Sequence, residues 1–177
     1  MSFRVLVSDK LDKKGIATLE AAGPGVVVDN RPGLSPAEQE AIIGDYDGLI
    51  VRSATKVNAA LLDKATKLKI VIRAGIGVDN IDVEAAIARG IIVTNTPKVL
   101  TEDTADMTMA LILAVPRRLA EGSAFMTGGH EWTGWTPTWM LGRRLGGKRL
   151  GIIGMGRIGR AVATRARAFG LQIHYHN

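Results

Sequence analysis

Short apolar runs alternate with helix-like patterns through the first hundred residues. The runs are rich in valine and isoleucine, and they cover residues 3–8, 26–29, 47–51, 69–73 and 91–94. The helix-like patterns between them cover residues 11–22, a stretch that begins at Ser35-Pro36, 58–66 and 82–89. Continuous apolar strands that alternate with helices are typical of a parallel sheet covered on both faces. The pattern predicts an α/β fold, with a flavodoxin-like unit of about five strands over residues 1–98.

The alternation stops after Asn95-Thr96-Pro97. A long helical pattern covers residues 101–126, and Pro116 inside it predicts a kink or a split into two helices, because proline lacks the N–H that a helix interior needs. A loop rich in glycine and tryptophan follows at residues 128–147. Residues 99–148 are therefore expected to form a long helix and an extended arm.

A second β-α-β pattern closes the sequence. An apolar strand is expected at residues 149–153, a helix at 157–169 and another strand at 171–176. Two strands are too few for an independently stable sheet. We expect residues 149–177 to be the beginning of an incomplete Rossmann domain.

The turn between this strand and helix has the spacing G-x-G-x-x-G. A bare match is weak evidence, but here the motif follows a strand and opens a helix, which is the context that dinucleotide binding requires. Gly154 would permit the tight turn, Gly156 the approach of a pyrophosphate, and Gly159 close helix–sheet packing. The N–H groups at the helix start attract phosphate. The cofactor contacts expected here are Gly154, Met155, Gly156, Arg157, Ile158 and Gly159; the alternative is a glycine-rich turn without a ligand.

Asn177 falls where the fingerprint expects an acid that hydrogen-bonds the adenosine ribose. An asparagine can bond a ribose hydroxyl and carries no charge to repel a 2′-phosphate. We therefore favour NADP(H), or use of both cofactors, over strict use of NAD(H).

Composition removes several other classes of function. The formal net charge is +6, but the basic residues are scattered and no groove-reading motif accompanies them, so we expect no nucleic-acid partner. No cysteine is present, and the most apolar stretch, residues 107–115, is too short to span a bilayer. We expect a cytoplasmic protein without a membrane partner. His174 and His176 share a strand face, but without a third ligand nearby we predict no metal site.

Several longer stretches resemble the D-isomer-specific 2-hydroxyacid dehydrogenases over essentially the whole sequence. Residues 51–57 (VRSATKV) and 73–82 (RAGIGVDNID) look like 3-phosphoglycerate dehydrogenase. Residues 100–106 (LTEDTAD), 132–139 (WTGWTPTW) and 174–177 (HYHN) look more like glyoxylate/hydroxypyruvate reductase. The resemblance implies that the flavodoxin-like unit binds substrate and that the Rossmann domain binds the cofactor, with the active site in the cleft between them.

The resemblance also implies a substrate site at the turn Gly75-Ile76-Gly77. Backbone amides at Ile76 and Gly77 would hold the substrate carboxylate, and successive N–H groups in such a turn form an anion-binding nest. The alternative is that Gly75 and Gly77 only permit an unusual turn.

The resemblance implies substrate or cofactor contacts for several other residues, and for some of them a structural role would explain the residue as well. Arg52 and Ser53 match residues that face the substrate, although a surface salt bridge would also explain the arginine. Arg157 and Ile158 match contacts to the cofactor pyrophosphate. Thr104 resembles a residue near the cofactor, and helix capping would explain it equally well.

Three tryptophans, Trp132, Trp135 and Trp139, lie in what resembles the family's dimerisation arm. The implied partner is a second copy of the chain, bound through residues 100–148. Trp139 matches a position that reaches towards the partner's active site, whereas all three would also serve as hydrophobic interface anchors.

The implied chemistry is hydride transfer between a nicotinamide cofactor and a small 2-oxo or 2-hydroxy acid. In the family an arginine, a glutamate and a histidine carry out the catalysis, and no catalytic residue of this kind matches residues 1–177. We expect this stretch alone to be inactive. The favoured activity is that of a glyoxylate/hydroxypyruvate reductase; the rivals are 3-phosphoglycerate dehydrogenase and a non-catalytic nucleotide-sensing protein of the same fold.

Overall fold

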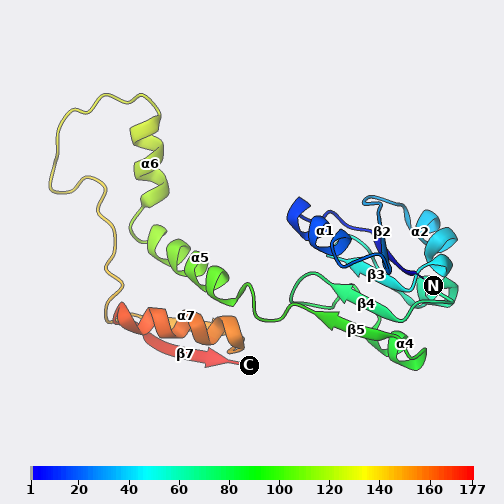
Figure 1. Cartoon of the computed structure of the whole chain (residues 1–177). Helices are drawn as coiled ribbons and strands as arrows, with labels where there is room; N and C mark the ends of the chain where they lie inside the picture. The colour runs from blue at the N-terminus through cyan, green and yellow to red at the C-terminus, as the bar shows by residue number, and fades with distance from the viewer. Residues whose placement is uncertain (1) are drawn as a thin grey trace. The chain divides into compact units, whose positions relative to one another are not determined.

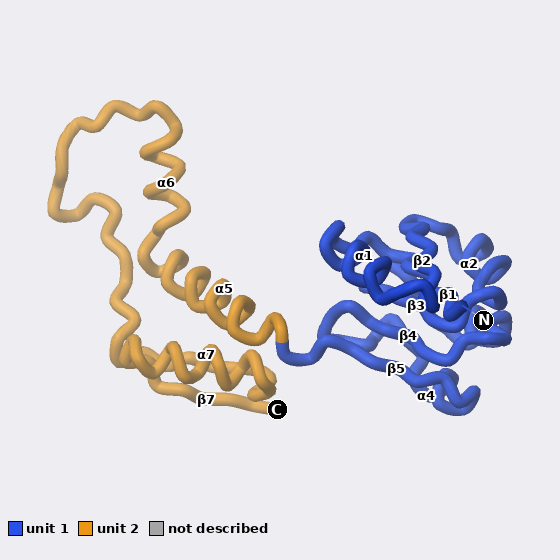
Figure 2. The backbone as a smooth tube through the Cα atoms, viewed as in Figure 1, with its two compact units in different colours: residues 1–98 blue, residues 99–177 orange. Residues whose placement is uncertain are grey.

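The computed structural model describes residues 2–177, which form two units, residues 2–98 and 99–177 (Figure 2). Each unit has its own apolar core. No helix within the described residues is both long and apolar enough to cross a bilayer.

The first unit is built on a five-stranded parallel sheet (Figure 1). Its strands are β1 (Phe3–Val7), β2 (Val26–Asn30), β3 (Gly48–Val51), β4 (Ile70–Arg73) and β5 (Ile92–Asn95). Their order across the sheet is β2-β1-β3-β4-β5, and every neighbouring pair is parallel. This is the flavodoxin-like order, so the fold expected from the alternating pattern is confirmed.

Helices cover both faces of this sheet (Figure 1). They are α1 (Lys13–Glu20), α2 (Pro36–Ile42), the 3-10 turn η1 (Ile43–Asp45), α3 (Ala59–Lys64) and α4 (Val83–Ala88). Strand β1 shows why both faces must be covered, because Leu6 belongs to one apolar cluster while Val5 and Val7 belong to another. Helix α2 begins as its sequence predicts, with a capping box between Ser35 and Glu38.

The second unit contains three helices and a two-stranded parallel sheet. Its elements are α5 (Thr101–Ala114), α6 (Leu119–Thr127), β6 (Arg149–Ile153), α7 (Arg157–Ala168) and β7 (Gln172–His176). The expected break at Pro116 is confirmed, since α5 ends before it and α6 starts after Arg118, which has a left-handed backbone (φ +54°).

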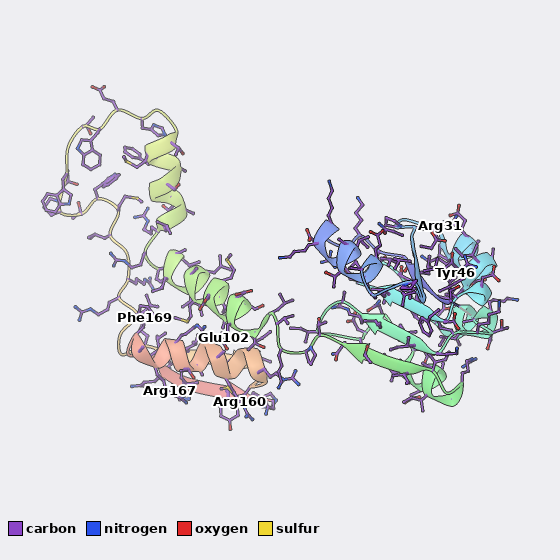
Figure 3. All side chains as sticks on the ribbon, viewed as in Figure 1. Arg31, Tyr46, Glu102, Arg160, Arg167 and Phe169 are labelled. Atoms are coloured by element: carbon purple, nitrogen blue, oxygen red, sulfur yellow. The ribbon has the colours of Figure 1, made fainter. Side chains whose placement is uncertain are left out.

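Helix α5 packs against α7 in this unit (Figure 2). Ala105 and Met109 of α5 share an apolar cluster with Val162 and Ala166 of α7. At the edge of the contact, Arg165 donates hydrogen bonds to Glu102, which Figure 3 labels, and to Asp106, at 2.7 and 2.6 Å. These two carboxylates raise the pKa of Arg165, Glu102 more than Asp106. Helix α5, α7 and the strands β6 and β7 thereby share one apolar cluster.

Candidate functional site

The first unit has a hollow of about 320 Å³ at the carboxyl ends of β1 and β3. Its lining includes Ser8, Asp9, Lys10, Gln39 and the loop from Arg52 to Thr55. β1 and β3 are neighbours in the sheet. After β1 the chain continues to β2 at one edge, and after β3 it continues to β4 and β5 at the other edge. Crevices at such a switch point are the usual ligand sites of open α/β sheets.

A buried carboxylate, Asp9, organises one wall of this hollow. Its side chain is 6% exposed and accepts hydrogen bonds from the backbone N–H of Arg52 at 2.6 Å, from the Thr55 N–H at 3.2 Å and from the Thr55 hydroxyl at 2.8 Å. Asn80, also buried, donates to the carbonyl oxygens of Arg52 and Thr55 at 2.8 and 2.7 Å. The loop that carries Arg52 and Ser53 is therefore fixed from both sides.

Neither Asp9 nor Asn80 was predicted from the sequence. Both lie 25 to 46 residues from the groups they bond, so no local motif connects them. The one available signal was a carboxylate directly after the apolar run of β1.

Arg52 and Ser53 are exposed on the rim of the hollow. The Arg52 guanidinium donates to the carbonyl oxygen of Lys10 at 3.3 Å and forms no ion pair with any residue from 2 to 177. The salt-bridge explanation for Arg52 is therefore wrong. Lys10 and Arg52 both line the hollow, so two cationic residues contribute to its surface.

The Gly75-Ile76-Gly77 turn follows β4, next to the loop after β3. Neither glycine has a positive φ, so the alternative of an unusual backbone conformation is not supported. A Cβ on Gly75 would overlap the Arg73 guanidinium, and one on Gly77 would lie 2.9 Å from Asp79 Oδ1, so a side chain at either position would require the end of the Arg73 or Asp79 side chain to move. Within residues 2–177 no hydrogen bond is donated by the backbone N–H of Ile76 or Gly77. These two groups are available to an anion, as an anion-binding nest requires.

Arg73 is a further candidate, which no motif indicated in the sequence. It ends β4, pairs in register with Val51 and so lies beside the strand that precedes Arg52. Its Nε is buried and has no hydrogen-bond partner among the described residues. A buried donor without a partner is costly, and here it adjoins the turn whose N–H groups are free.

The glycine loop of the second unit has the geometry that its spacing predicts. Gly154 has φ +92°, a backbone conformation that residues with a side chain rarely adopt. A Cβ on Gly159 would overlap the carbonyl oxygen of Gly154, so α7 can approach the loop only at a glycine. A Cβ on Gly156 would meet no atom within 4 Å. That open side is where a pyrophosphate could reach the backbone at the start of α7.

Asn177 lies beside this loop because β6 and β7 pair in register. Ile153 pairs with His176, and the Gly154 N–H donates to the His176 carbonyl at 2.7 Å. One residue further along, the Met155 N–H donates a hydrogen bond to Asn177 Oδ1 at 2.7 Å. Asn177 thus contacts the loop directly.

Thr104 does not cap α5. The N-cap position is Leu100, without a side-chain hydrogen bond, and Thr104 lies one turn inside the helix. The capping explanation for Thr104 is therefore wrong, and its exposed side chain stays a candidate for a cofactor contact.

Trp139 belongs to an aromatic cluster of the arm. Its ring meets those of Phe125 and Trp132 edge-on, with centroids 5.2 and 5.3 Å apart. The ring of His130 stacks on that of Phe125, at a centroid distance of 5.1 Å. Trp135 forms no such ring pair within the described chain and is 72% exposed.

His174 and His176 lie on β7, with exposed side chains. No cluster of three or more metal-ligating side chains occurs in residues 2–177.

Comparison with known proteins places the chain in a family. The model of the D-isomer specific 2-hydroxyacid dehydrogenase catalytic domain matches residues 5–169. A glyoxylate reductase of Thermococcus litoralis is 50% identical over 139 residues, which are 76% of this chain and 42% of the relative. A D-3-phosphoglycerate dehydrogenase of Methanocaldococcus jannaschii is 44% identical over 170 residues, 96% of this chain and 31% of the relative.

A solved structure from Thermus thermophilus is similar throughout, with a TM-score of 0.87 and 45% identity over 98% of this chain and 56% of that one. The chain spans less than half the length of the two curated relatives. The family model covers nearly all of it, and the fold and both glycine turns agree with that match. The chain belongs to the D-isomer-specific 2-hydroxyacid dehydrogenase family.

Proposed function

We propose that the intact protein is an NAD(P)-dependent D-2-hydroxyacid dehydrogenase that acts as a glyoxylate/hydroxypyruvate reductase. The observation that carries the class is the glycine loop, in which Gly154 turns the backbone and Gly159 admits α7 to it. The choice of the reductase is supported by the higher identity to the glyoxylate reductase, 50% against 44%.

The residues of this chain would bind and orient the two reactants. The free N–H groups of Ile76 and Gly77 would hold the substrate carboxylate, with Arg52 and Ser53 towards its other end. The loop from Gly154 to Gly159 would hold the pyrophosphate, with Thr104 also near the cofactor. The nicotinamide, when bound, supplies or accepts the hydride. Because the implied catalytic arginine, glutamate and histidine match no residue here, residues 1–177 alone should bind without turnover.

A turnover comparison on the intact protein tests the proposal. Oxidation of NADPH should be followed with glyoxylate and with hydroxypyruvate, and reduction of NAD with 3-phosphoglycerate. We expect the largest kcat/KM with glyoxylate or hydroxypyruvate. Binding of NAD(P)H without turnover of any 2-oxo acid would instead indicate a nucleotide sensor.

3-Phosphoglycerate dehydrogenase is kept as the second candidate because of the rim of the hollow. Lys10 and Arg52 lie together there, and two cations suit a substrate that carries a phosphate besides its carboxylate. If this candidate is right, Lys10→Ala should weaken binding of 3-phosphoglycerate and leave that of glyoxylate unchanged.

We also propose that the arm, residues 100–148, joins two copies of the chain, and that Trp139 reaches towards the partner's site. The support is the series of large apolar side chains exposed along it, among them Leu119, Met126, Trp135 and Leu141.

A further inference from the structure

We propose that Asn95 is a positioning residue for the substrate carboxylate, because its side chain holds the Ile76–Gly77 peptide group with the Gly77 N–H facing the anion. This role rests on the proposed function and names a residue that acts on the substrate through the turn. The observation that carries it is a hydrogen bond from Asn95 Nδ2 to the Ile76 carbonyl oxygen at 2.7 Å.

Strand pairing brings Asn95 to the turn. Asn95 is the last residue of β5 and pairs in register with Arg73, the last residue of β4. The chain leaves β4 into the turn Gly75-Ile76-Gly77, so the end of β5 lies beside that turn (Figure 1). Asn95 and Ile76 are 19 positions apart in the sequence, so no local motif connects them. The side chain of Asn95 is half-buried there.

Both peptide groups of the turn are held through their carbonyl oxygens. Besides the bond from Asn95, the Thr96 N–H donates to the Gly75 carbonyl at 2.9 Å. In a trans peptide group the C=O and the N–H point in opposite directions. The two carbonyls are directed towards the end of β5, so the N–H groups of Ile76 and Gly77 are directed away from it. Neither N–H donates to a residue from 2 to 177, and both are available to an anion on that side.

The side chain at this position must be a donor, because only a donor can hold a carbonyl oxygen. The Asn95 amide offers an N–H, whereas a carboxylate in its place would offer oxygens only and would repel the Ile76 carbonyl. Without the donor, the peptide group could rotate and turn that carbonyl, instead of the Gly77 N–H, towards the anion. A peptide dipole that is fixed in advance needs no reorganisation when the carboxylate arrives.

The other end of the turn is held by separate contacts. The Asn80 side chain donates to the carbonyl oxygens of Arg52 and Thr55 at 2.8 and 2.7 Å. The backbone carbonyl of Asn80 accepts from the Val57 N–H at 2.9 Å. Loss of the Asn95 amide should therefore release one peptide group and leave the rest of the turn in place.

The experiment compares reduction of glyoxylate and of hydroxypyruvate by the intact protein and by Asn95→Ala. We expect the KM for these acids to rise about tenfold, as for a weakened hydrogen bond to a charged group, and kcat to change less than about twofold. Such a split indicates lost binding of the carboxylate and not lost chemistry. Asn95→Asp should raise the KM further, because its charge also repels the substrate. The Kd for NADPH should stay the same in both variants.

Asn58→Ala is the matched control. Asn58 is an asparagine of the same unit whose side chain also bonds one backbone group, since it accepts from the Leu61 N–H at 2.9 Å at the start of α3. Loss of a helix cap lowers stability, so both alanine variants should melt at a lower temperature than the unaltered protein. Only Asn95→Ala should raise the KM.

Hydrogen exchange gives a readout that does not depend on turnover. Oxalate, a dicarboxylate that cannot be reduced by hydride transfer, is the probe, with NADPH present. It should protect the Gly77 amide in the unaltered protein and in Asn58→Ala, and protect it less in Asn95→Ala. An unchanged KM in Asn95→Ala, or equal rises in the two alanine variants, would overturn the role of Asn95 and leave the proposed function intact. An unaltered protein that reduces neither acid would overturn the proposed function, and a Gly77 amide that oxalate does not protect would overturn the role of Asn95.

Discussion

Tyr46 shows how a single buried hydroxyl is satisfied in the first unit. The side chain is 2% exposed, its hydroxyl donates to the Asp29 carboxylate, and the Arg4 guanidinium lies 4.8 Å from the ring centroid. Figure 3 labels Tyr46 together with Arg31. Burial raises the pKa of Tyr46, and the hydrogen bond to Asp29 raises it further.

Tyr46→Phe should lower the free energy of unfolding by about 1–2 kcal/mol, because Asp29 loses a partner. The raised pKa adds a pH dependence. The unfolded tyrosine loses its proton near pH 10 and the folded one only above that, so its stabilisation is complete below about pH 10 and is lost as pH rises further. Urea unfolding should therefore show a steeper alkaline loss for the unaltered protein than for Tyr46→Phe. Equal slopes would contradict this account.

Asp9 has a comparable role at the candidate site. Asp9→Ala would leave the N–H groups of Arg52 and Thr55 without their acceptor and should cost about 2–3 kcal/mol of stability. Because the loop carries Arg52 and Ser53, the KM for substrate should rise as well. The matched control is Asp45→Ala, which removes an exposed carboxylate of a surface ion pair and should have little effect on either measurement.

At the scale of the elements, the glycine loop and α7 are so close that one added methyl group at Gly159 would disturb their contact. Gly159→Ala would place a methyl group against the Gly154 carbonyl oxygen, and overpacking of this kind costs about 1–3 kcal/mol. We expect NADPH binding, measured by its fluorescence, to weaken at least tenfold. Gly151→Ala on β6, where a Cβ meets nothing within 4 Å, is the control and should bind normally.

The elements themselves were largely predictable because their signals are local. Apolar runs located the five strands of the first unit, Ser35-Pro36 located a helix start, and Pro116 located the break between α5 and α6. The start of α5 was predicted at residue 101, where the structure places it, although its N-cap, Leu100, forms no side-chain hydrogen bond.

The candidate site was predictable only where a motif is continuous in sequence. The loop from Gly154 to Gly159 and the turn at Gly75 to Gly77 are of this kind. The contacts of Asp9 with Thr55 and of Asn177 with Met155 depend on strand pairing, which brings together residues 46 and 22 positions apart. The periodic pattern of apolar residues along the sequence does not show which strands pair with each other.

At the scale of the whole molecule, the arm exposes several large apolar side chains, among them Leu119, Met126, Trp135 and Leu141. Phe125 of α6 contacts Trp132 and Trp139 of the following loop, and the two tryptophans contact each other. Trp135 lies outside this cluster and is exposed, as is Leu141. Large aromatic side chains are enriched at the centres of protein interfaces. An arm with an unpaired tryptophan fits a surface that a second copy of the chain covers.

Trp135→Ala therefore tests the proposed dimer. Loss of a central tryptophan typically costs about 2 kcal/mol or more of binding energy, so the dimer dissociation constant should rise roughly 30-fold or more, as measured by sedimentation equilibrium. Ile87→Ala, which removes an equally exposed apolar side chain from α4 outside the arm, should leave the constant unchanged. Since Trp135 has no ring partner among the described residues to lose, its removal should not disturb the fold of the arm, and the aromatic circular dichroism of the cluster should persist. An unaltered protein that sediments as a monomer would show that some other partner, or solvent, covers this surface.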